Sequence, residues 1–386
     1  MDRFYLRRFH ANAIFHCIRV EPNISQREIA DRTGFDKSTV SSVVNEFAER
    51  GLIERKVKTG EARRGRPSEG LMISPGSGVL VGVQVEASEM EFVLCRLDGS
   101  PLASRVKAFS GDLRGLEDFI LSGLSDLVAE AGATAPILGI GVSLPGLVNN
   151  EGILVHVPVL GWRDVDIVER LGRVCPAPVF VGNDGKAAAI AEHMFGACIG
   201  LDNFIYLFSG SGVGGALFLD GTVHKGAAGL AGELGHIKIV PQGRFCTCGA
   251  AGCLSAYLSE SALLEEVERL SGSRPESFRD LLARADNGDA AVLNVLDHAG
   301  DVLGSAVSSL INIFNPPVVL LGGDLALGER YVAPSLERSL QRLAHPAMNS
   351  RCTVRFAGDG SGRPRLGGVA LALDGVTGLD GSHVLP

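Results

Sequence analysis

Apolar residues in the first part of the chain recur with the period of an α-helix. Between residues 4 and 20 they fall on one side of a helix, at Leu6, Phe9, Ile14, Cys17 and Ile18. Ser25 and Glu28 have the spacing of a capping box, which predicts the start of a short second helix. That helix would bury Ile29 and Ala30 and end at Thr33-Gly34.

A third helix is predicted to begin at Asp36 and to end near Gly51. Its apolar face consists of Val40, Val43, Val44 and Phe47. Two short helices joined by a turn that contains glycine are typical of a helix-turn-helix. Apolar runs at 52–55 and 71–74 then predict the two strands of a wing, so residues 1–75 are expected to form a winged helix.

The polar side of the third helix carries the residues that we expect to reach DNA bases and phosphates in the major groove. These residues are Lys37, Ser38, Thr39, Ser41, Ser42 and Asn45. The wing adds Arg63, Arg64 and Arg66, whose charge suits the negative potential of an A·T-rich minor groove. The alternative is a solvated basic loop beside a helical hairpin used for dimer contacts.

From residue 79 onward, short apolar strands alternate with helices, which predicts an α/β body. Strands are expected at 79–85, 91–97, 137–143, 179–182, 204–209, 214–219 and 318–321, and helices at 115–131, 185–195, 260–270 and 290–312. Segment 91–97 is expected to be the hairpin partner of the first strand, with a turn at Asp98-Gly99. The pattern favours two lobes around a cleft.

Charge separates the head of the chain from its body. Residues 1–70 hold 14 Lys and Arg against 10 Asp and Glu, a net charge of +4, whereas the whole chain carries −8 and the remainder therefore −12. We expect only the head to meet a polyanion. No apolar run reaches the length of about 18 residues that predicts a membrane span, so we expect no membrane association.

The N-terminal segment is charged and amphipathic, unlike a signal peptide. Five cysteines lie far apart in the sequence, as is usual for reduced thiols in the cytoplasm, where we expect this protein to act. They are Cys17, Cys95, Cys175, Cys198 and Cys352.

The other three cysteines lie close together and follow a histidine. His236, Cys246, Cys248 and Cys253 form a Cys3His set, which satisfies a tetrahedral zinc ion completely. Because such a site leaves no open position for water, the sequence predicts structural rather than hydrolytic zinc. The alternative is that three cysteines share a loop by chance.

Six segments of the body form a set that is informative as a whole: Leu144-Pro145-Gly146, Gly161-Trp162, Asn183-Asp184, residues 210–214, residues 232–236 with the cysteine cluster, and residues 315–323. Together these segments resemble the ROK family of repressors, open reading frames and sugar kinases. The resemblance covers residues 79–375 and implies an actin-like (ribonuclease-H-like) fold of two lobes. It implies a small lobe at 76–194, against which 360–386 packs, and a large lobe at 195–359 with the zinc loop.

The resemblance also implies an effector site. In the kinases of the family, the residue matching Asp184 is the general base for a sugar hydroxyl, and those matching Asn183, Glu233 and His236 hold hydroxyls. Carboxylates and amides suit vicinal hydroxyls because they accept or donate hydrogen bonds in pairs. Zinc bound to one imidazole nitrogen of His236 would fix the ring toward the ligand. The alternative for Asn183-Asp184 is a turn with a side-chain cap.

The chain departs from the kinases of the family at the first phosphate loop. The family pattern Asp-x-Gly-Gly-Thr is replaced by Gln84-Val-Glu86-Ala87-Ser88. A neutral Gln84 cannot organise magnesium as a carboxylate does, and the charge of Glu86 would repel phosphate. We therefore expect no kinase activity.

Two sugar-contact positions also depart from the family. Val159 stands in place of an asparagine, and Ser255 in place of a glutamate. These differences favour an unusual sugar, a less polar ligand or a weaker affinity. His156 and Arg163 lie close enough in the sequence to substitute.

An N-terminal winged helix on such a body resembles the repressor branch of the family, which controls genes for glucose, xylose or N-acetylglucosamine. The sequence thus predicts a homodimeric or tetrameric repressor of carbohydrate-metabolism genes that binds double-stranded operator DNA and is gated by a small carbohydrate. The alternatives are a bifunctional ATP-dependent sugar kinase and a ligand-independent regulator controlled by a protein partner.

Overall fold

The computed structural model describes residues 3–57, 69–358 and 365–378. Contacts between residues divide the chain into two compact units. Unit 1 comprises residues 1–144, 164–182 and 364–386, and unit 2 comprises residues 145–163 and 183–363. The chain thus passes between the units four times. The winged helix groups with the first sheet of the body, and the expected three-part division stays a prediction.

The head of unit 1 has the elements predicted for a winged helix. They are helices α1 (Arg3–Val20), α2 (Gln26–Thr33) and α3 (Lys37–Glu49) and the antiparallel strands β1 (Ile53–Val57) and β2 (Glu69–Ile73). The capping box is present, because the Ser25 side chain accepts from the Glu28 backbone N–H and the Glu28 carboxylate accepts from that of Ser25. Gly34 ends α2 with φ 72°, a conformation that glycine adopts without strain.

The core of the winged helix matches the predicted faces of α2 and α3 but not all of α1. Ile14 and Ile18 are buried, together with the whole predicted face of α3. Leu6 and Phe9 were predicted to face the core, yet their exposed fractions are 42% and 44%. The first turns of α1 extend past this core, and the Phe9 ring lies edge-on to Phe35 at the surface.

The body of unit 1 is built on one five-stranded sheet in the order β10-β6-β3-β4-β5. Its strands are β3 (Val79–Val85), β4 (Glu89–Arg96), β5 (Pro101–Ala108), β6 (Ile137–Leu144) and β10 (Val179–Asn183). Its helices are η1 (Leu113–Gly115), α4 (Leu116–Ala131), α5 (Ile167–Gly172) and α14 (Gly367–Thr377). The predicted pairing of β3 with β4 is confirmed. However, the turn at Asp98-Gly99 leads from β4 into β5, a strand that was not predicted.

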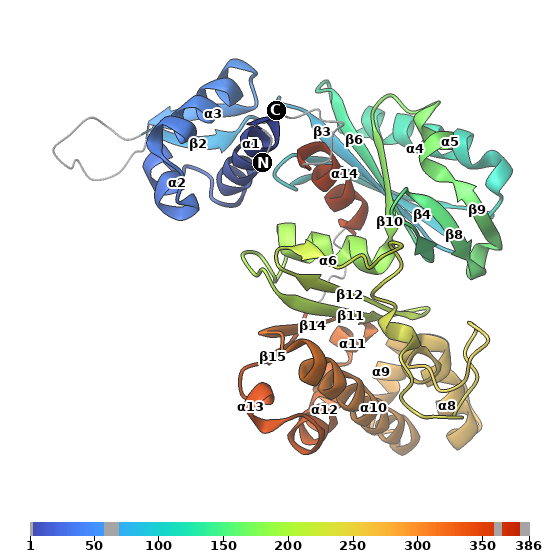
Figure 1. Ribbon diagram of the computed structural model, residues 1–386. Coiled ribbons are helices and arrows are strands. Elements are labelled where there is room, and N and C mark those ends of the chain that lie inside the picture. The colour runs from blue at the N-terminus through green and yellow to red at the C-terminus, as the bar shows by residue number, and fades with distance from the viewer. Residues whose placement is uncertain (1–2, 58–68, 359–364, 379–386) are drawn as a thin grey trace. The chain divides into compact units, whose positions relative to one another are not determined.

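Helix α14 lies directly against strands β3 and β6 of this sheet (Figure 1). A Cβ atom added to Gly141 would lie 1.9 Å from the carbonyl oxygen of Gly368, so only glycine allows helix and strand to approach this closely. The helix also packs on β10, where the Phe180 ring lies against Gly375 and the Leu371 side chain against Gly182. Helix α14 is thereby fixed to three strands, β3, β6 and β10.

Unit 2 contains the second five-stranded sheet, in the order β13-β12-β11-β14-β15. Its strands are β11 (Phe204–Ser209), β12 (Val213–Leu219), β13 (Thr222–Val223), β14 (Val318–Gly323) and β15 (Thr353–Phe356). Its helices are α6 (Asp184–Phe195), η3 (Leu234–His236), α7 (Ser255–Leu258), α8 (Glu260–Ser271), α9 (Phe278–Asp286), α10 (Ala290–Phe314), α11 (Asp324–Leu327), α12 (Glu329–Leu343) and α13 (Pro346–Asn349). Two such sheets confirm the predicted two-lobed α/β body.

A large apolar core holds unit 2 together, and α10 contributes most of its length to that core. Figure 1 shows α10 and α12 side by side beneath the sheet, as their contacts also indicate. A smaller sheet has the order β7-β8-β9, formed by Leu147–Val148, Ile153–Val157 and Trp162–Asp166, with η2 (Pro158–Leu160) before its last strand. Among the described residues, no helix combines the length and the apolar character needed to cross a bilayer.

Candidate functional site

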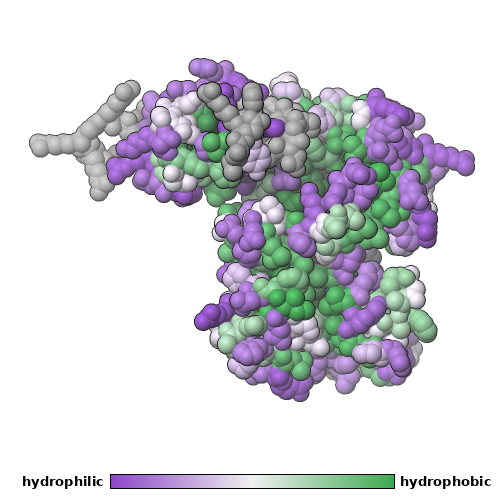
Figure 2. All heavy atoms as spheres, viewed as in Figure 1, coloured by the Kyte–Doolittle hydropathy of each residue, from purple (hydrophilic) through white to green (hydrophobic). Residues whose placement is uncertain are grey.

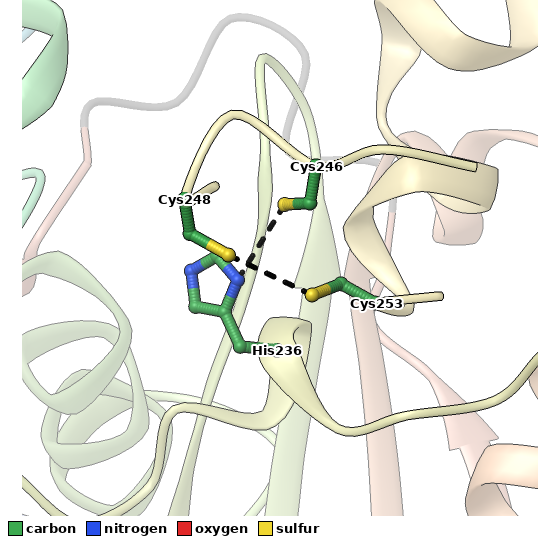
Figure 3. Close-up of side chains that lie close together, drawn as sticks. All are labelled: His236, Cys246, Cys248 and Cys253. Carbon is green, nitrogen blue, oxygen red and sulfur yellow. Dashed lines mark hydrogen bonds between the residues drawn. The ribbon is translucent and has the colours of Figure 1, made fainter. Parts of the chain in front are cut away.

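Four side chains in the segment 236–253 of unit 2 point toward one another (Figure 3). The ligand atoms of His236, Cys246, Cys248 and Cys253 all lie within 4.8 Å of one another. The Cys246 Sγ atom is 3.7 Å from Nδ1 of His236, and the sulfurs of Cys248 and Cys253 are also 3.7 Å apart. The structure thus brings the predicted set together in a group able to hold a metal ion.

The backbone between these four residues folds back on itself, which explains how they meet. The backbone N–H of Cys246 donates to the Ala250 carbonyl at 2.8 Å, and the backbones of Lys238 and Cys253 pair as an isolated antiparallel β-bridge. The Lys238 ammonium also donates to the Cys253 sulfur at 2.7 Å. Burial, with Lys238 nearby, lowers the pKa of His236, which favours the neutral form of imidazole that binds metals.

Asn183 and Asp184 lie where strand β10 gives way to helix α6. The Asn183 side chain caps α6 by accepting from the Lys186 N–H at 3.1 Å, which is the structural role considered as the alternative. Its amide group also donates to the Gly146 carbonyl at 3.0 Å and to the Asp184 carboxylate at 3.0 Å. Asp184 in turn accepts from the Gly185 N–H at 2.8 Å. These bonds fix both side chains at the helix N-terminus.

Glu233 immediately precedes η3 and His236 ends it, so one short turn positions both residues. Burial raises the pKa of the Glu233 carboxyl, and the nearby Lys186 ammonium opposes that rise. Because this charge interaction joins the first turn of α6 to the segment before η3, both halves of the predicted effector set belong to one neighbourhood of unit 2.

Lys186 is a residue of this neighbourhood that the sequence did not single out. Its side chain is 9% exposed, and its ammonium donates to the carbonyl oxygen of Gly229, 43 residues along the chain. The only signal in the sequence is a charged residue within the apolar run of α6, two positions after Asp184. Burial of the ammonium lowers its pKa, which Glu233 opposes.

The positions that depart from the family have distinct surroundings. Val159 is 61% exposed, and the Ser255 hydroxyl donates to the backbone carbonyl of Gly235 at 2.9 Å. His156 is half-buried and Arg163 is exposed. Trp162, the single tryptophan of the chain, is buried.

The candidate DNA-binding residues of α3 lie at or near the surface. Lys37, Ser42 and Asn45 are exposed, and on the face drawn in Figure 2 hydrophilic residues gather over the winged helix. The hydroxyl groups of Ser38 and Thr39 bond to the capping carboxylate of Asp36.

Two further observations concern the candidate DNA contacts. Asn45 accepts a hydrogen bond from the Arg55 guanidinium on β1 at 2.6 Å, which adds a cation to this face. Ser41 is half-buried. Arg63, Arg64 and Arg66 lie outside the described residues.

A polar stripe on α1, formed by Asn12, His16 and Arg19, faces other parts of unit 1. The Asn12 amide donates to the carbonyl oxygen of Thr377, at the end of α14, at 2.7 Å. His16 Nε2 lies 3.4 Å from the Thr377 hydroxyl. Burial lowers the pKa of Arg19 to about 10, although Asp98 opposes this shift.

The segment that replaces the first phosphate loop is closed by charged contacts within unit 1. Gln84 is buried and its amide donates to the Glu86 carboxylate at 3.4 Å. Arg365, just before α14, forms an ion pair with Glu86 and lies 4.0 Å from the Glu91 carboxylate. A guanidinium therefore neutralises the carboxylate that the sequence places here.

Comparisons with known proteins agree with both parts of this structure. The family model described as the ROK family matches residues 80–375, and that described as the MarR family matches residues 7–65. The chain is 26% identical to a xylose repressor of Bacillus subtilis over 375 residues, which cover 97% of each chain. It is 31% identical to a putative xylose repressor of a Caldicellulosiruptor species, covering 79% of this chain and 82% of that one.

A solved structure also matches nearly the whole chain. That crystal structure is of a ROK family transcriptional regulator described as a homologue of the Escherichia coli MLC protein. It matches with a TM-score of 0.83 and 25% identity, over 97% of each chain.

Proposed function

The chain belongs to the ROK family, and from this premise we propose that it is a DNA-binding transcriptional repressor of carbohydrate-metabolism genes, gated by a small carbohydrate. One observation carries the proposal. The chain, winged helix and two-lobed body together, aligns over 97% of both chains with a protein named a xylose repressor.

The winged helix supplies the DNA-binding surface. Helix α3 enters the major groove with Lys37, Ser38, Thr39, Ser41, Ser42 and Asn45 on its polar side, and Arg63, Arg64 and Arg66 follow the backbone or the minor groove. Arg55, whose guanidinium donates a hydrogen bond to the Asn45 side chain, adds positive charge beside Asn45. The chain acts as a homodimer or tetramer, so that paired winged helices meet half-sites about one helical turn apart.

The effector binds at Asn183, Asp184, Glu233 and His236 of unit 2. Amide and carboxylate groups there pair with vicinal hydroxyls. The carboxylate of Glu233 is half-buried, and a partly desolvated acceptor binds a hydroxyl more strongly than an exposed one does.

The Cys3His group holds a structural zinc ion. Zn–S bonds of about 2.3 Å at tetrahedral angles place two sulfurs about 3.8 Å apart, and a sulfur and an imidazole nitrogen about 3.6 Å apart. The observed separations of 3.7 Å for both pairs fit this donor set. Zinc bound to His236 fixes the orientation of the imidazole ring. His236 thereby couples the metal loop to the effector site.

Helix α14 is the route by which the effector site influences the winged helix. Strand β10 packs on α14 through Phe180 and runs directly into Asn183 and Asp184. The far end of α14 accepts the hydrogen bond from Asn12 of the winged helix. A carbohydrate that shifts the end of β10 thus alters the contact that holds α1, and with it the spacing of paired winged helices.

The chain has lost kinase activity. Glu86 stands where phosphate would approach, and its ion pair with Arg365 fills the loop with side chains. The alternative of a bifunctional sugar kinase predicts carbohydrate-dependent release of ADP from ATP in a coupled assay.

A regulator controlled by a protein partner is the other alternative. The exposed Val159 and the inward-turned Ser255 favour it, because each removes a polar contact from the effector site. This alternative predicts that no carbohydrate binds.

Two measurements test the proposal. Enrichment of genomic fragments on the purified protein, followed by footprinting, is expected to find operators beside carbohydrate-metabolism genes. Fluorescence of the buried Trp162 is then titrated with pentoses, hexoses, amino sugars and polyols. A saturable change with one class supports the carbohydrate gate. Specific DNA binding without any carbohydrate response would refute the gate and favour the protein partner.

A further inference from the structure

Lys186 is a buried cation without an ion-pair partner in the described part of the chain. Its side chain is 9% exposed, and its ammonium donates to the carbonyl oxygen of Gly229. No carboxylate of the described residues lies within 4.0 Å of that ammonium. Burial of an unpaired charge is unfavourable, and an ammonium has three protons to donate, of which one is used here.

Glu233 is the complementary group. Its carboxylate is half-buried and makes no hydrogen bond or ion pair with the described residues, yet it senses the Lys186 charge. The Lys186 stem runs beside the residue before Glu233, because its Cε lies 3.9 Å from where a Cβ of Gly232 would be. The Lys186 ammonium, a donor, and the Glu233 carboxylate, an acceptor of opposite charge, therefore lie in the same region of unit 2 without a direct hydrogen bond or ion pair between them.

The chemistry of the group that fits between them is restricted. It must accept a hydrogen bond from the ammonium and donate one to the carboxylate, and a hydroxyl does both. A phosphate or carboxylate only accepts, so it would gain from Lys186 but be repelled by Glu233. Lys225, the other cation that acts on Lys186, is exposed.

We propose that Lys186 and Glu233 bind one hydroxyl of a neutral carbohydrate between them, and that Lys186 is a specificity-determining residue of the effector site. This inference rests on the proposed function, since it concerns the same carbohydrate gate. It adds a contact that compensates for the polar groups lost at Val159 and Ser255. It also excludes acidic sugars as the effector.

The experiment uses the full chain and measures binding by the fluorescence of Trp162. The probes are D-glucose, D-xylose and N-acetyl-D-glucosamine with their monodeoxy analogues, and glucose 6-phosphate and glucuronate as acidic sugars. Lys186→Met is compared with Lys225→Met, which removes the same group from an exposed position nearby. Circular dichroism and bound zinc verify that each variant is folded.

The unaltered protein is expected to bind one neutral sugar and to bind one monodeoxy analogue of it about 10- to 100-fold more weakly, as loss of a hydrogen bond to a charged group implies. Lys186→Met should bind the parent sugar more weakly by a similar factor and should no longer distinguish that analogue. Lys225→Met should behave as the unaltered protein. A merely structural role of Lys186 would weaken all sugars alike and preserve the discrimination.

Three results would overturn the inference. One is a Lys186→Met protein that distinguishes every deoxy analogue as the unaltered protein does. Another is binding of the acidic sugars alone, which would leave the proposed carbohydrate-gated repressor intact. The third is the absence of any carbohydrate binding, which would remove the proposed gate as well. If Lys186→Met does not fold, the monodeoxy series on the unaltered protein decides, because equal affinity for all analogues contradicts a bridged hydroxyl.

Discussion

Asn12→Ala tests whether the contact between α1 and α14 transmits the effector signal. The substitution removes the amide that donates to the Thr377 carbonyl at 2.7 Å, in a partly buried position. That carbonyl is in the last turn of a helix, where carbonyl groups lack partners within the helix. The Thr377 hydroxyl cannot replace the amide, because it donates to Leu373.

The expected effect of Asn12→Ala on the coupling between carbohydrate and DNA binding follows from the free energy of this hydrogen bond. Its net contribution is about 1 kcal/mol, rising to about 3 kcal/mol if the carbonyl is left without a partner. If the contact differs between the effector-free and effector-bound states, its loss changes the coupling between carbohydrate and DNA by about 5- to 150-fold. We expect the ratio of operator Kd values with and without carbohydrate to fall by at least about fivefold.

The assay is fluorescence anisotropy of labelled operator DNA, with and without a saturating concentration of the carbohydrate that the Trp162 titration identifies. Asn312→Ala is the matched control, since Asn312 also donates to a carbonyl near a helix end, that of Leu343 in unit 2. The control should keep the ratio of the unaltered protein. An Asn12→Ala protein whose ratio also stays within about twofold would refute the role of α14.

The remaining predictions concern metal, packing and pH. Cys253→Ala should lose most of the bound zinc, measured by mass spectrometry. Cys352→Ser, a control outside the Cys3His group, should keep its zinc. A full equivalent of zinc in Cys253→Ala would contradict the assigned ligands. Gly141→Ala should lower the free energy of unfolding, measured with urea, by about 1–3 kcal/mol, because the new Cβ atom collides with the backbone of Gly368. Gly115→Ala is the control and should change this free energy little, because a Cβ atom there meets nothing within 4 Å. Equal effects of the two substitutions would argue against the close packing of α14. Burial, with Glu260 nearby, raises the pKa of Asp324 from 3.8 to about 7. A carboxyl whose pKa is raised by folding contributes its full stability below its ordinary pKa, begins to lose it once the unfolded carboxyl ionises, and has lost all of it above about pH 7. Asp324→Asn should therefore raise the Tm clearly more at pH 8 than at pH 5. A Tm difference that is the same at both pH values would show that this carboxyl does not titrate as described.

The sequence predicted best those features whose determinants lie close together along the chain. The capping box at Ser25 and the apolar face of α3 depend on neighbours three or four residues apart, and both are present. The four residues able to hold a metal ion span only residues 236–253, so a short loop suffices to gather them. Asn183 and Asp184 were identified from the family pattern, and they lie between a strand and a helix as the apolar pattern around them predicted, whereas their role in effector binding stays a prediction.

Features that depend on residues far apart in the chain could not be predicted from the sequence. Strand β5 was missed because its alternation is weak and its pairing with β4 decides its conformation. Lys186 resembles an ordinary helix residue until Gly229 is brought to its ammonium. The exposure of Leu6 has the same origin, because helical periodicity shows which side is apolar but not where the core ends.

The central claim is that a carbohydrate bound at Asn183, Asp184, Glu233 and His236 controls operator binding. The most direct measurement is the operator Kd of the zinc-loaded protein across the carbohydrate panel, for the unaltered chain and for Asp184→Ala. The account predicts that one class of carbohydrate weakens operator binding by the unaltered chain, and that Asp184→Ala binds the operator equally well but no longer responds. A response that survives in Asp184→Ala would contradict the assigned effector site.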